Sequence, residues 1–594
     1  MSFEENFEDG DIDLKGLPLQ TIRIIRELRE GDDDLYFNEM IESEFRALLE
    51  HLKENNYNIE HLTFYFNLKY MGDNIYEEML NAFEKYSSIK EINILAFPER
   101  QETRKKMVEF LGRRPNLETI SFYLNEHNQQ EELLEEMLAM LSKKPLLKTL
   151  KIQRLNLTKS ISFSLSKFLL ENKCVSKLEL ELLEGHKNSY KIFEALNLNK
   201  GVEELQLKSF VWQFLKEKET NSFLKENKTL KSLSFYNCSF YSSFTKQIAE
   251  FFSTNNSLTS LMLSDCSSSE NYSFLDSLKT NSSFHSLSLH GVVLEEEETR
   301  NIMSLLEAGF LKELEIVDCF VSAEENETLL CGEERESFLG LLKKSHSLEK
   351  LSLIRFQLSK EQVSAIISEN NHLQSLNVSD NKVCPQVFSL LKENKTLKSF
   401  ACSDVEDDES EEAYYGVAEV IKENICLTEL HLNEFKMSNK EQEEILKALC
   451  HNRALKVFEY ANSCVNKLRD FSLFTSVIRA SKTLKIFVWE SDGKTEEELK
   501  ETVEALKENS SLTKLEIKLY EANGDLRDTN LALQITKQLS LNRKIEERDT
   551  RTKLNMLILQ KRRDGNIVSS VPRRLLVYLL SFLERVTMDK KELS

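Results

Sequence analysis

One phrase recurs along the chain. The nine residues LKENKTLKS begin at Leu224 and again at Leu391, and looser copies begin at Leu52, Ile421 and Leu506. Written as L-x-x-N-x-x-L-x-x-L-x-h, where h is apolar, the phrase can be followed through most of the 594 residues. A phrase repeated at a nearly constant interval predicts an array of small similar units stacked along one axis.

The penultimate apolar position of each copy, which we call the anchor, sets the period. Successive anchors stand about 28 residues apart on average, within the range typical of leucine-rich repeats. The interval from Leu314 to Leu351 is longer and predicts an inserted loop near 322–336. The anchors are Leu62, Ile92, Ile120, Leu150, Leu178, Leu205, Leu233, Leu261, Leu287, Leu314, Leu351, Leu376, Phe400, Leu430, Phe458, Phe487 and Leu515.

Each copy combines two kinds of periodicity. Around Leu233 apolar and polar residues alternate, as in a half-buried strand, so that Leu233 and Phe235 point to one side. Between the strands the apolar residues recur at helical spacing, as Ile445, Leu446, Leu449 and Cys450 do. Each unit is therefore predicted to be strand, turn and helix, and its apolar face is buried only by the next unit.

The ten cysteines show neither a CxxC pair nor a regular Cys/His ligand spacing, which argues against a zinc module and a disulfide scaffold. Cys238, Cys266 and Cys319 stand five residues after their anchors, in the turn, and Cys402 takes an inward strand position. Because free cysteine behaves as a small hydrophobe, we predict that these four side chains belong to the core.

These turns, in SFYNCSF, MLSDCSS, EIVDCFV and NVSDNKV, give the chain a family resemblance. The chain resembles leucine-rich repeat proteins of the ribonuclease-inhibitor type over residues 41–545. The resemblance implies an α/β solenoid of about 17 strand–turn–helix repeats, a horseshoe with a parallel sheet on its concave face and helices on its convex face. It implies little about function, because the shared residues are the buried ones.

Composition and charge limit the partners. A net charge of −21 disfavours nucleic acid and anionic membranes, and no apolar stretch approaches 18 residues. The acidic start has no signal-peptide pattern, so we expect a cytoplasmic monomer without a membrane anchor. We predict an acidic N-terminal cap at 1–40, a second loop near 404–412 within the array, and a basic helical C-terminal cap at 546–594.

The predicted partner site lies in the middle of the array. Residues one before, one after and three after an anchor should line the concave sheet. In three successive repeats none of these nine residues is Lys, Arg, Asp or Glu, which leaves a patch that is easily desolvated, with interface-forming Tyr and Met. Small polar residues also suit a crowded concave sheet with no partner, and that alternative stays open. The nine, which we call the concave floor, are Ser232, Ser234, Tyr236, Ser260, Met262, Ser264, Ser286, Ser288 and His290.

Signs of catalysis are weak. The chain has no GxxxxGK[ST], HExxH, GxSxG or GxGxxG motif, and the sequence assigns no nucleophile or carboxylate partner to His290 or His431. We expect Trp212 and Trp489 to serve packing. The sequence therefore predicts a protein that is not an enzyme, needs no cofactor or metal, and binds a protein partner whose identity the sequence does not reveal.

Three more specific hypotheses rest on resemblance. The Lys-, Asn-, Glu- and Phe-rich, divergent repeats resemble those of effectors that intracellular bacteria inject into host cells, which would place the chain in the host cytosol. The stretch VPRRLLVYLLSFL, residues 571–583, resembles the first helix of an F-box, which would make the chain a substrate receptor for ubiquitin ligation. One branch of the same repeat family activates GTPases, although no arginine here is singled out for that role.

Overall fold

The computed structural model consists of two compact units, Met1–Glu409 and Ser410–Ser594, which we call the N-terminal and C-terminal units. The structure describes residues 34–36, 42–54, 59–64, 73–95, 97–98, 100–124, 131–184, 186–212, 223–268, 272–294, 296–319, 333–403, 416–433, 435, 437–461, 471–489, 496–516, 534–535 and 537–545.

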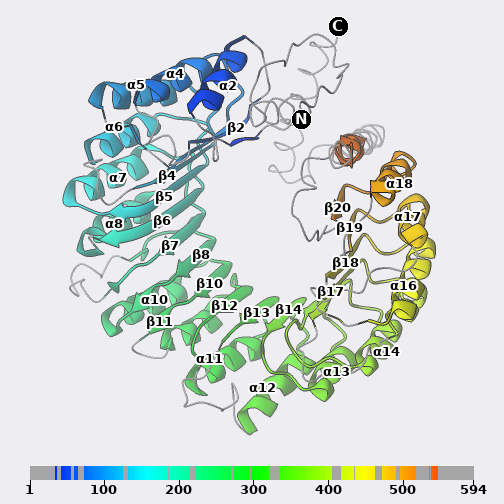
Figure 1. Ribbon diagram of the computed structural model, residues 1–594. Coiled ribbons are helices and arrows are strands. Elements are labelled where there is room, and N and C mark those ends of the chain that lie inside the picture. Colours follow the sequence, from blue (N-terminus) through cyan, green and yellow to red (C-terminus); the bar gives the residue numbers. More distant parts are fainter. Residues whose placement is uncertain are drawn as a thin grey trace, which may run out of the picture. The chain divides into compact units, whose positions relative to one another are not determined.

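Parallel strands form a continuous sheet in the N-terminal unit, in chain order (Figure 1). A short parallel pair, β9 (Ser239–Phe240) and β11 (Ser267–Ser268), follows two of them. The sheet strands are β1 (Asp34–Tyr36), β2 (His61–Phe64), β3 (Glu91–Ile94), β4 (Thr119–Tyr123), β5 (Thr149–Asn156), β6 (Lys177–Glu184), β7 (Glu204–Lys208), β8 (Ser232–Tyr236), β10 (Ser260–Ser264), β12 (Ser286–His290), β13 (Glu313–Val317), β14 (Lys350–Ile354), β15 (Ser375–Asn377) and β16 (Ser399–Ser403).

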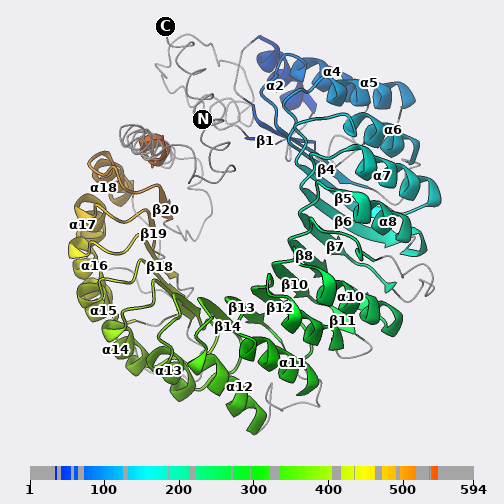
Figure 2. The same ribbon diagram turned by 180° about the vertical axis from the view of Figure 1, so that it is seen from behind.

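Helices alternate with these strands and cover the outer face of the sheet, so that the strands line the inner, concave face of this unit (Figures 1 and 2). Two of the described helices are 3-10 helices, η1 (His186–Asn188) and η3 (Ser273–Thr280). The α-helices are α2 (Glu42–Glu54), α4 (Asp73–Phe83), α5 (Gln101–Gly112), α6 (Glu131–Leu141), α7 (Lys159–Glu171), α8 (Tyr190–Leu198), α10 (Ser242–Thr254), α11 (Glu296–Glu307), α12 (Glu333–Lys344), α13 (Lys360–Glu369) and α14 (Pro385–Glu393).

The C-terminal unit repeats the same plan, with parallel strands in register. Residues 537–545 are also helical. Its other elements are α15 (Val417–Glu423), β17 (Glu429–Asn433), α16 (Asn439–His451), β18 (Val457–Ala461), α17 (Phe471–Ala480), β19 (Ile486–Trp489), α18 (Glu496–Lys507) and β20 (Lys514–Glu516).

The predicted repeat register is confirmed. Every anchor lies in a strand and is buried, and each described pairing between two anchor-bearing strands aligns anchor with anchor, as Leu233, Leu261 and Leu287 are aligned in β8, β10 and β12. The fold is therefore the predicted α/β leucine-rich repeat solenoid. Strand β1 lies within the segment 1–40 that we predicted to be a cap, and it pairs with β2 through Leu35 and Leu62.

The predicted core residues are also buried. Cys238, Cys266, Cys319 and Cys402 are at most 5% exposed, and burial raises the pKa of the Cys319 thiol to about 12. Trp212 lies against Phe244 with ring centroids 3.7 Å apart. Trp489 packs in the core of the C-terminal unit, so both tryptophans serve packing as predicted. Helix α16 buries Ile445, Leu446 and Leu449, whereas Cys450 is only half-buried.

The asparagine of the recurring phrase links neighbouring repeats. It stands six residues before the anchor, at what we call the ladder position, and Asn255, for example, is the C-cap residue of α10. Asn255 is typical: its Oδ1 accepts from the backbone N–H groups of Ser257 and Leu258, at 2.8 and 2.7 Å. Its Nδ2 donates to the carbonyl of Asn227, the ladder residue of the preceding repeat, at 2.7 Å. The same arrangement recurs at Asn172, Asn199, Asn370 and Asn509.

Several predicted features fall outside the described residues. These are the acidic loop at 404–412, the basic segment 546–594 with its F-box-like stretch 571–583, and most of the loop predicted near 322–336. Residues 333–336 are described and form the start of α12. The predictions made for these segments stay predictions.

Candidate functional site

The nine residues of the concave floor come from three neighbouring strands, β8, β10 and β12. The parallel register arranges them in three rows that run across the strands. Adjacent strands in a sheet lie roughly 4.8 Å apart, so each row places its side chains in direct contact range. The rows are Ser232–Ser260–Ser286, Ser234–Met262–Ser288 and Tyr236–Ser264–His290.

Two of the nine residues are nearly covered although they occupy concave positions. Ser234 is 6% exposed and Ser264 8% exposed, whereas the other seven are half-buried. Within its row Ser264 stands between Tyr236 and His290, so two rings flank a short side chain on a concave surface. The accessible part of the floor therefore consists mainly of Tyr236, Met262 and His290, with serines between them.

Tyr236 is held by two neighbours. Its hydroxyl lies 3.1 Å from the Met262 sulfur, to which it donates, and the Lys208 ammonium sits 5.3 Å from the centre of its ring. A thioether is a weak acceptor, so the Tyr236 hydroxyl remains available for a stronger one. Lys208 occupies the same row on β7 and is the cationic margin of the floor.

His290 has partners that sequence reasoning missed. Its Nε2 lies 3.0 Å from the Ser288 hydroxyl and 3.1 Å from the Glu315 carboxylate on β13. The Ser288 hydroxyl also donates to Glu315. The hydrogen bond from His290, with that from Ser288, lowers the pKa of Glu315 despite partial burial. The signal was available, because Glu315 directly follows its anchor, as Ser288 does in the adjacent repeat.

The Ser288–His290–Glu315 cluster does not have the geometry of a catalytic triad. In a catalytic triad the nucleophile and the carboxylate bind opposite nitrogens of the imidazole. One nitrogen takes the proton of the nucleophile, and the carboxylate orients the ring through the other nitrogen. Here both partners meet Nε2. Two further His–Glu pairs join adjacent strands: His61 with Glu91 at 3.3 Å, and His431 with Glu459 at 2.7 Å. Such pairs are a recurring feature of the concave sheet.

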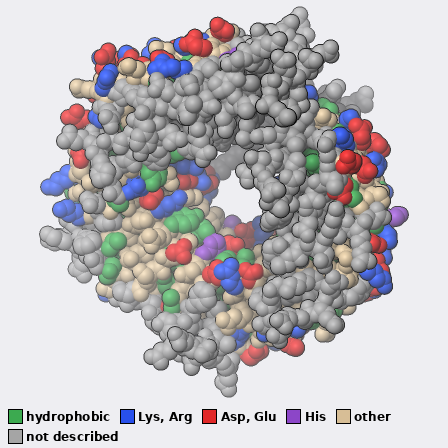
Figure 3. All heavy atoms as spheres, in the orientation of Figure 1, with side chains coloured by type: hydrophobic (Ala, Val, Ile, Leu, Met, Phe, Trp, Pro, Cys, Tyr) green, Lys and Arg blue, Asp and Glu red, His purple; other side chains and the backbone are tan. Residues whose placement is uncertain are grey.

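Charged side chains bound the floor on both sides. On β6 and β7 they neutralise one another, because Lys177 lies 3.2 Å from Glu179 and 3.7 Å from Glu204. On the other side Glu313 pairs with Lys350 at 2.6 Å and accepts from Ser286 at 3.1 Å. In Figure 3 the inner surface of this unit shows tan and green side chains with red, blue and purple ones beside them.

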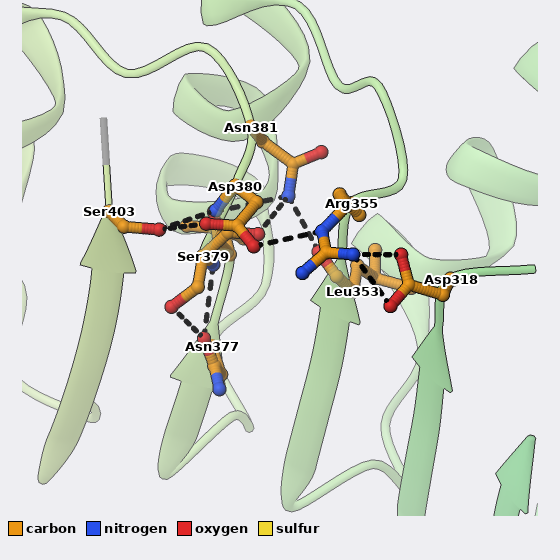
Figure 4. A network of polar contacts seen from close by, with 9 residues as sticks. Asp318, Leu353, Arg355, Asn377, Ser379, Asp380, Asn381 and Ser403 are labelled. Carbon is orange, nitrogen blue, oxygen red and sulfur yellow. Dashed lines mark hydrogen bonds and ion pairs between the residues drawn. The ribbon is translucent and has the colours of Figure 1, made fainter. Parts of the chain in front are cut away.

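The turns at the carboxyl ends of the strands form a polar rim beside the floor. In most of these repeats the residue four after the anchor has a positive φ, for example Asn237, Asp265, Gly291 and Asp318. Further along the rim, Figure 4 shows Arg355 between two carboxylates, bound to both Asp318 oxygens at 2.7 and 2.9 Å and to Asp380 at 3.0 Å. Asp318 and Asp380 are thus compensated by one arginine.

Other chemistries find little support in the described residues. No group of three or more His, Cys, Asp or Glu side chains is placed to hold a metal ion within them. Nor does any described helix have the length and apolar character needed to cross a bilayer. A hollow of about 420 Å³ lies away from the floor, between the ends of α11 and α12, and is lined by Leu306, Gly309, Leu341 and His346 among others.

Repeated strand–turn–helix units, a parallel sheet with aligned anchors and a ladder of polar residues define both units as leucine-rich repeat solenoids. The chain matches neither a protein-family model nor a curated protein. Among solved structures it is similar to leiomodin-1 actin-binding site 2, at 14% identity over 38% of this chain and 99% of that one, with a TM-score of 0.19. It is also similar to TLR13 in its complex with ssRNA13, at 13% identity over 77% of this chain, with a TM-score of 0.33. The chain spans only 64% of the TLR13 chain, and scores this low carry no argument about function.

Proposed function

We propose that this chain is a non-enzymatic binding scaffold of the ribonuclease-inhibitor type, which holds a protein partner on its concave floor. The observation that carries the proposal is the half-buried pair Tyr236 and Met262, set among serines and bounded by ion-paired charges. Desolvating such a surface costs little, and aromatic and methionine side chains are enriched in protein interfaces. We further propose that the chain acts as a monomer in the cytoplasm, and in the host cytosol if it is an injected effector.

The proposal requires no cofactor. The cysteine thiols in the repeat turns are buried, and the one histidine of the floor lacks triad geometry. Nothing in the described residues favours the GTPase-activator or F-box hypotheses over a binding scaffold, since the F-box-like stretch lies outside them.

The test is affinity capture from cell extract with mass spectrometry as the readout, comparing three proteins. The floor variant carries Tyr236→Glu, Met262→Glu and His290→Glu. The control variant carries Phe163→Glu, Leu170→Glu and Leu198→Glu, three exposed apolar residues of α7 and α8. We expect one protein to be held by the wild type and the control and lost by the floor variant, with unchanged circular dichroism. Equal capture by all three proteins would rule out the floor as the site.

A further inference from the structure

Two carboxylates beside the concave floor lack the compensation that their neighbours have. Glu313 is paired with Lys350, and Asp318 is paired with Arg355. Among the described residues, Glu315 has an ion-pair partner only in His290, and no lysine or arginine lies within ion-pair distance of Asp265. Asp265 accepts a hydrogen bond from Ser264 at 2.9 Å.

These two carboxylates approach the floor from opposite sides of β12. Glu315 lies on β13 and reaches Ser288 and His290. Asp265 directly follows β10, and its Oδ1 lies over Gly291: a Cβ added to Gly291 would stand only 2.4 Å from this oxygen. Because Gly291 has no side chain, nothing at that residue separates the Asp265 carboxylate from the carboxyl end of β12, where His290 lies.

The two sides of the floor thus differ in charge. Lys208 marks the β7 side, where it already rests on the Tyr236 ring. On the other side Glu315 lies on β13, and the Asp265 carboxylate lies over Gly291 at the carboxyl end of β12. A positively charged group placed on this side would be attracted by both carboxylates without displacing any described ion pair to a lysine or arginine.

We propose that the protein partner inserts a basic segment here, with a lysine or arginine side chain between Glu315 and Asp265 and a neighbouring apolar or aromatic side chain on Tyr236 and Met262. This inference rests on the proposed function, since it names the chemistry of the partner at the same floor. Charge complementarity of this kind directs encounter and sets the register of a complex.

The experiment selects a displayed library of random 12-residue peptides against the full chain at about 0.15 M ionic strength, where exposed long-range attraction is largely screened. We expect enriched peptides to carry Lys or Arg next to an aromatic or aliphatic residue. Glu315→Gln, which keeps the shape and an acceptor for Ser288, should weaken their binding about tenfold. The matched control is Glu349→Gln, which removes a carboxylate paired with Lys312 outside the floor and should leave binding unchanged.

The outcomes separate this inference from the proposed function. Peptides that require Tyr236 and Met262 but are acidic, or are indifferent to Glu315→Gln, overturn the inference and leave the floor as the binding site. Basic peptides that bind the Tyr236→Glu, Met262→Glu variant equally well reflect the net charge alone and overturn it too. If no selected peptide depends on the floor, both the inference and the proposed function are wrong.

Discussion

The first repeats and the middle repeats of the N-terminal unit are linked to their preceding repeats by different side chains at the ladder position. In the middle repeats the ladder position is asparagine, as at Asn227 and Asn255. In the first repeats it is Tyr86, Arg114 and then Lys144. All of these side chains donate to backbone carbonyls of the preceding repeat: Tyr86 to Leu52 at 2.7 Å, Arg114 to Tyr86 at 2.8 Å, and Lys144 to Arg114 at 2.7 Å.

The difference shows which part of the asparagine's role the two regions share. An arginine or lysine has no acceptor, so it cannot bind the N–H groups of its own turn as Asn255 does. At Arg114 and Lys144 the next residue is proline, which disfavours helical backbone in the residue before it and so helps end the helix. Donation to the preceding repeat is therefore shared by both regions, whereas ending the helix is a separate task that proline can take over.

The largest effect is expected from Asn255→Ala. This substitution leaves the carbonyl of Asn227 and two turn N–H groups without their partners in a buried site, and should lower the free energy of unfolding by about 3 kcal/mol. Urea unfolding followed by Trp212 fluorescence in a Trp489→Phe background measures the N-terminal unit. The adjacent, exposed Asn256→Ala is the matched control and should change stability little. Equal losses at both positions would mean that the ladder bonds carry no net stability.

The second prediction, Gly291→Ala, concerns the turns that follow the strands, whereas the ladder residues precede the strands. Asparagine and aspartate adopt this positive φ in neighbouring repeats, at Asn237, Asp265 and Asp318, but an alanine is strained in this conformation. The new Cβ would also stand 2.4 Å from the Asp265 Oδ1, so this carboxylate would have to rotate away. We expect the free energy of unfolding to fall by about 2 kcal/mol. Gly340→Ala, which meets no atom within 4 Å in α12, should instead raise it by about 0.5–1 kcal/mol.

A gain is expected where the ladder is interrupted. Ala308 and Ser345 occupy two successive ladder positions, and the hollow between α11 and α12 lies beside them. The Ser345 hydroxyl accepts from Leu348 N–H at 3.3 Å, as asparagine would, but serine is too short to reach the preceding repeat. Ser345→Asn should therefore stabilise the N-terminal unit by about 1 kcal/mol in urea titrations. The exposed Ser368→Asn serves as the control, and no difference between the two would show that the hollow excludes the longer side chain.

The smallest effect concerns pH. Burial, reinforced by the charge of Arg114, lowers the pKa of Lys144. Over the range between that lowered pKa and the ordinary value of 10.5, the unfolded chain binds more protons than the folded one, so stability rises with pH. Lys144→Asn, which installs the residue of the middle repeats, should remove this alkaline rise. Thermal unfolding of both proteins by circular dichroism across that range measures the difference. An unchanged pH profile would contradict the assignment of a desolvated lysine to the ladder.

Much of the fold was predictable because the buried positions are occupied by apolar residues at a regular spacing in the sequence. Anchors such as Leu233 and Leu351, and the turn cysteines Cys238 and Cys319, are apolar at constant spacing and all are buried. The positions of the floor residues in the strands were predicted, but the exposure of their side chains was not. That Ser234 and Ser264 are covered depends on the size of neighbours in other repeats, which a spacing argument along one chain does not include.

The recurring phrase established the repeat, its strand and its helix, since each needs only local periodicity and the requirement that an apolar face be covered. The partners of polar side chains came from three-dimensional contact. His290 meets Glu315, Asp265 lies over Gly291, and Lys144 takes the place of an asparagine because parallel stacking brings together residues about one repeat apart in sequence. Hydrogen bonds and ion pairs are sensitive to differences of a few tenths of an ångström in the distance between donor and acceptor. These distances are set only when neighbouring repeats pack.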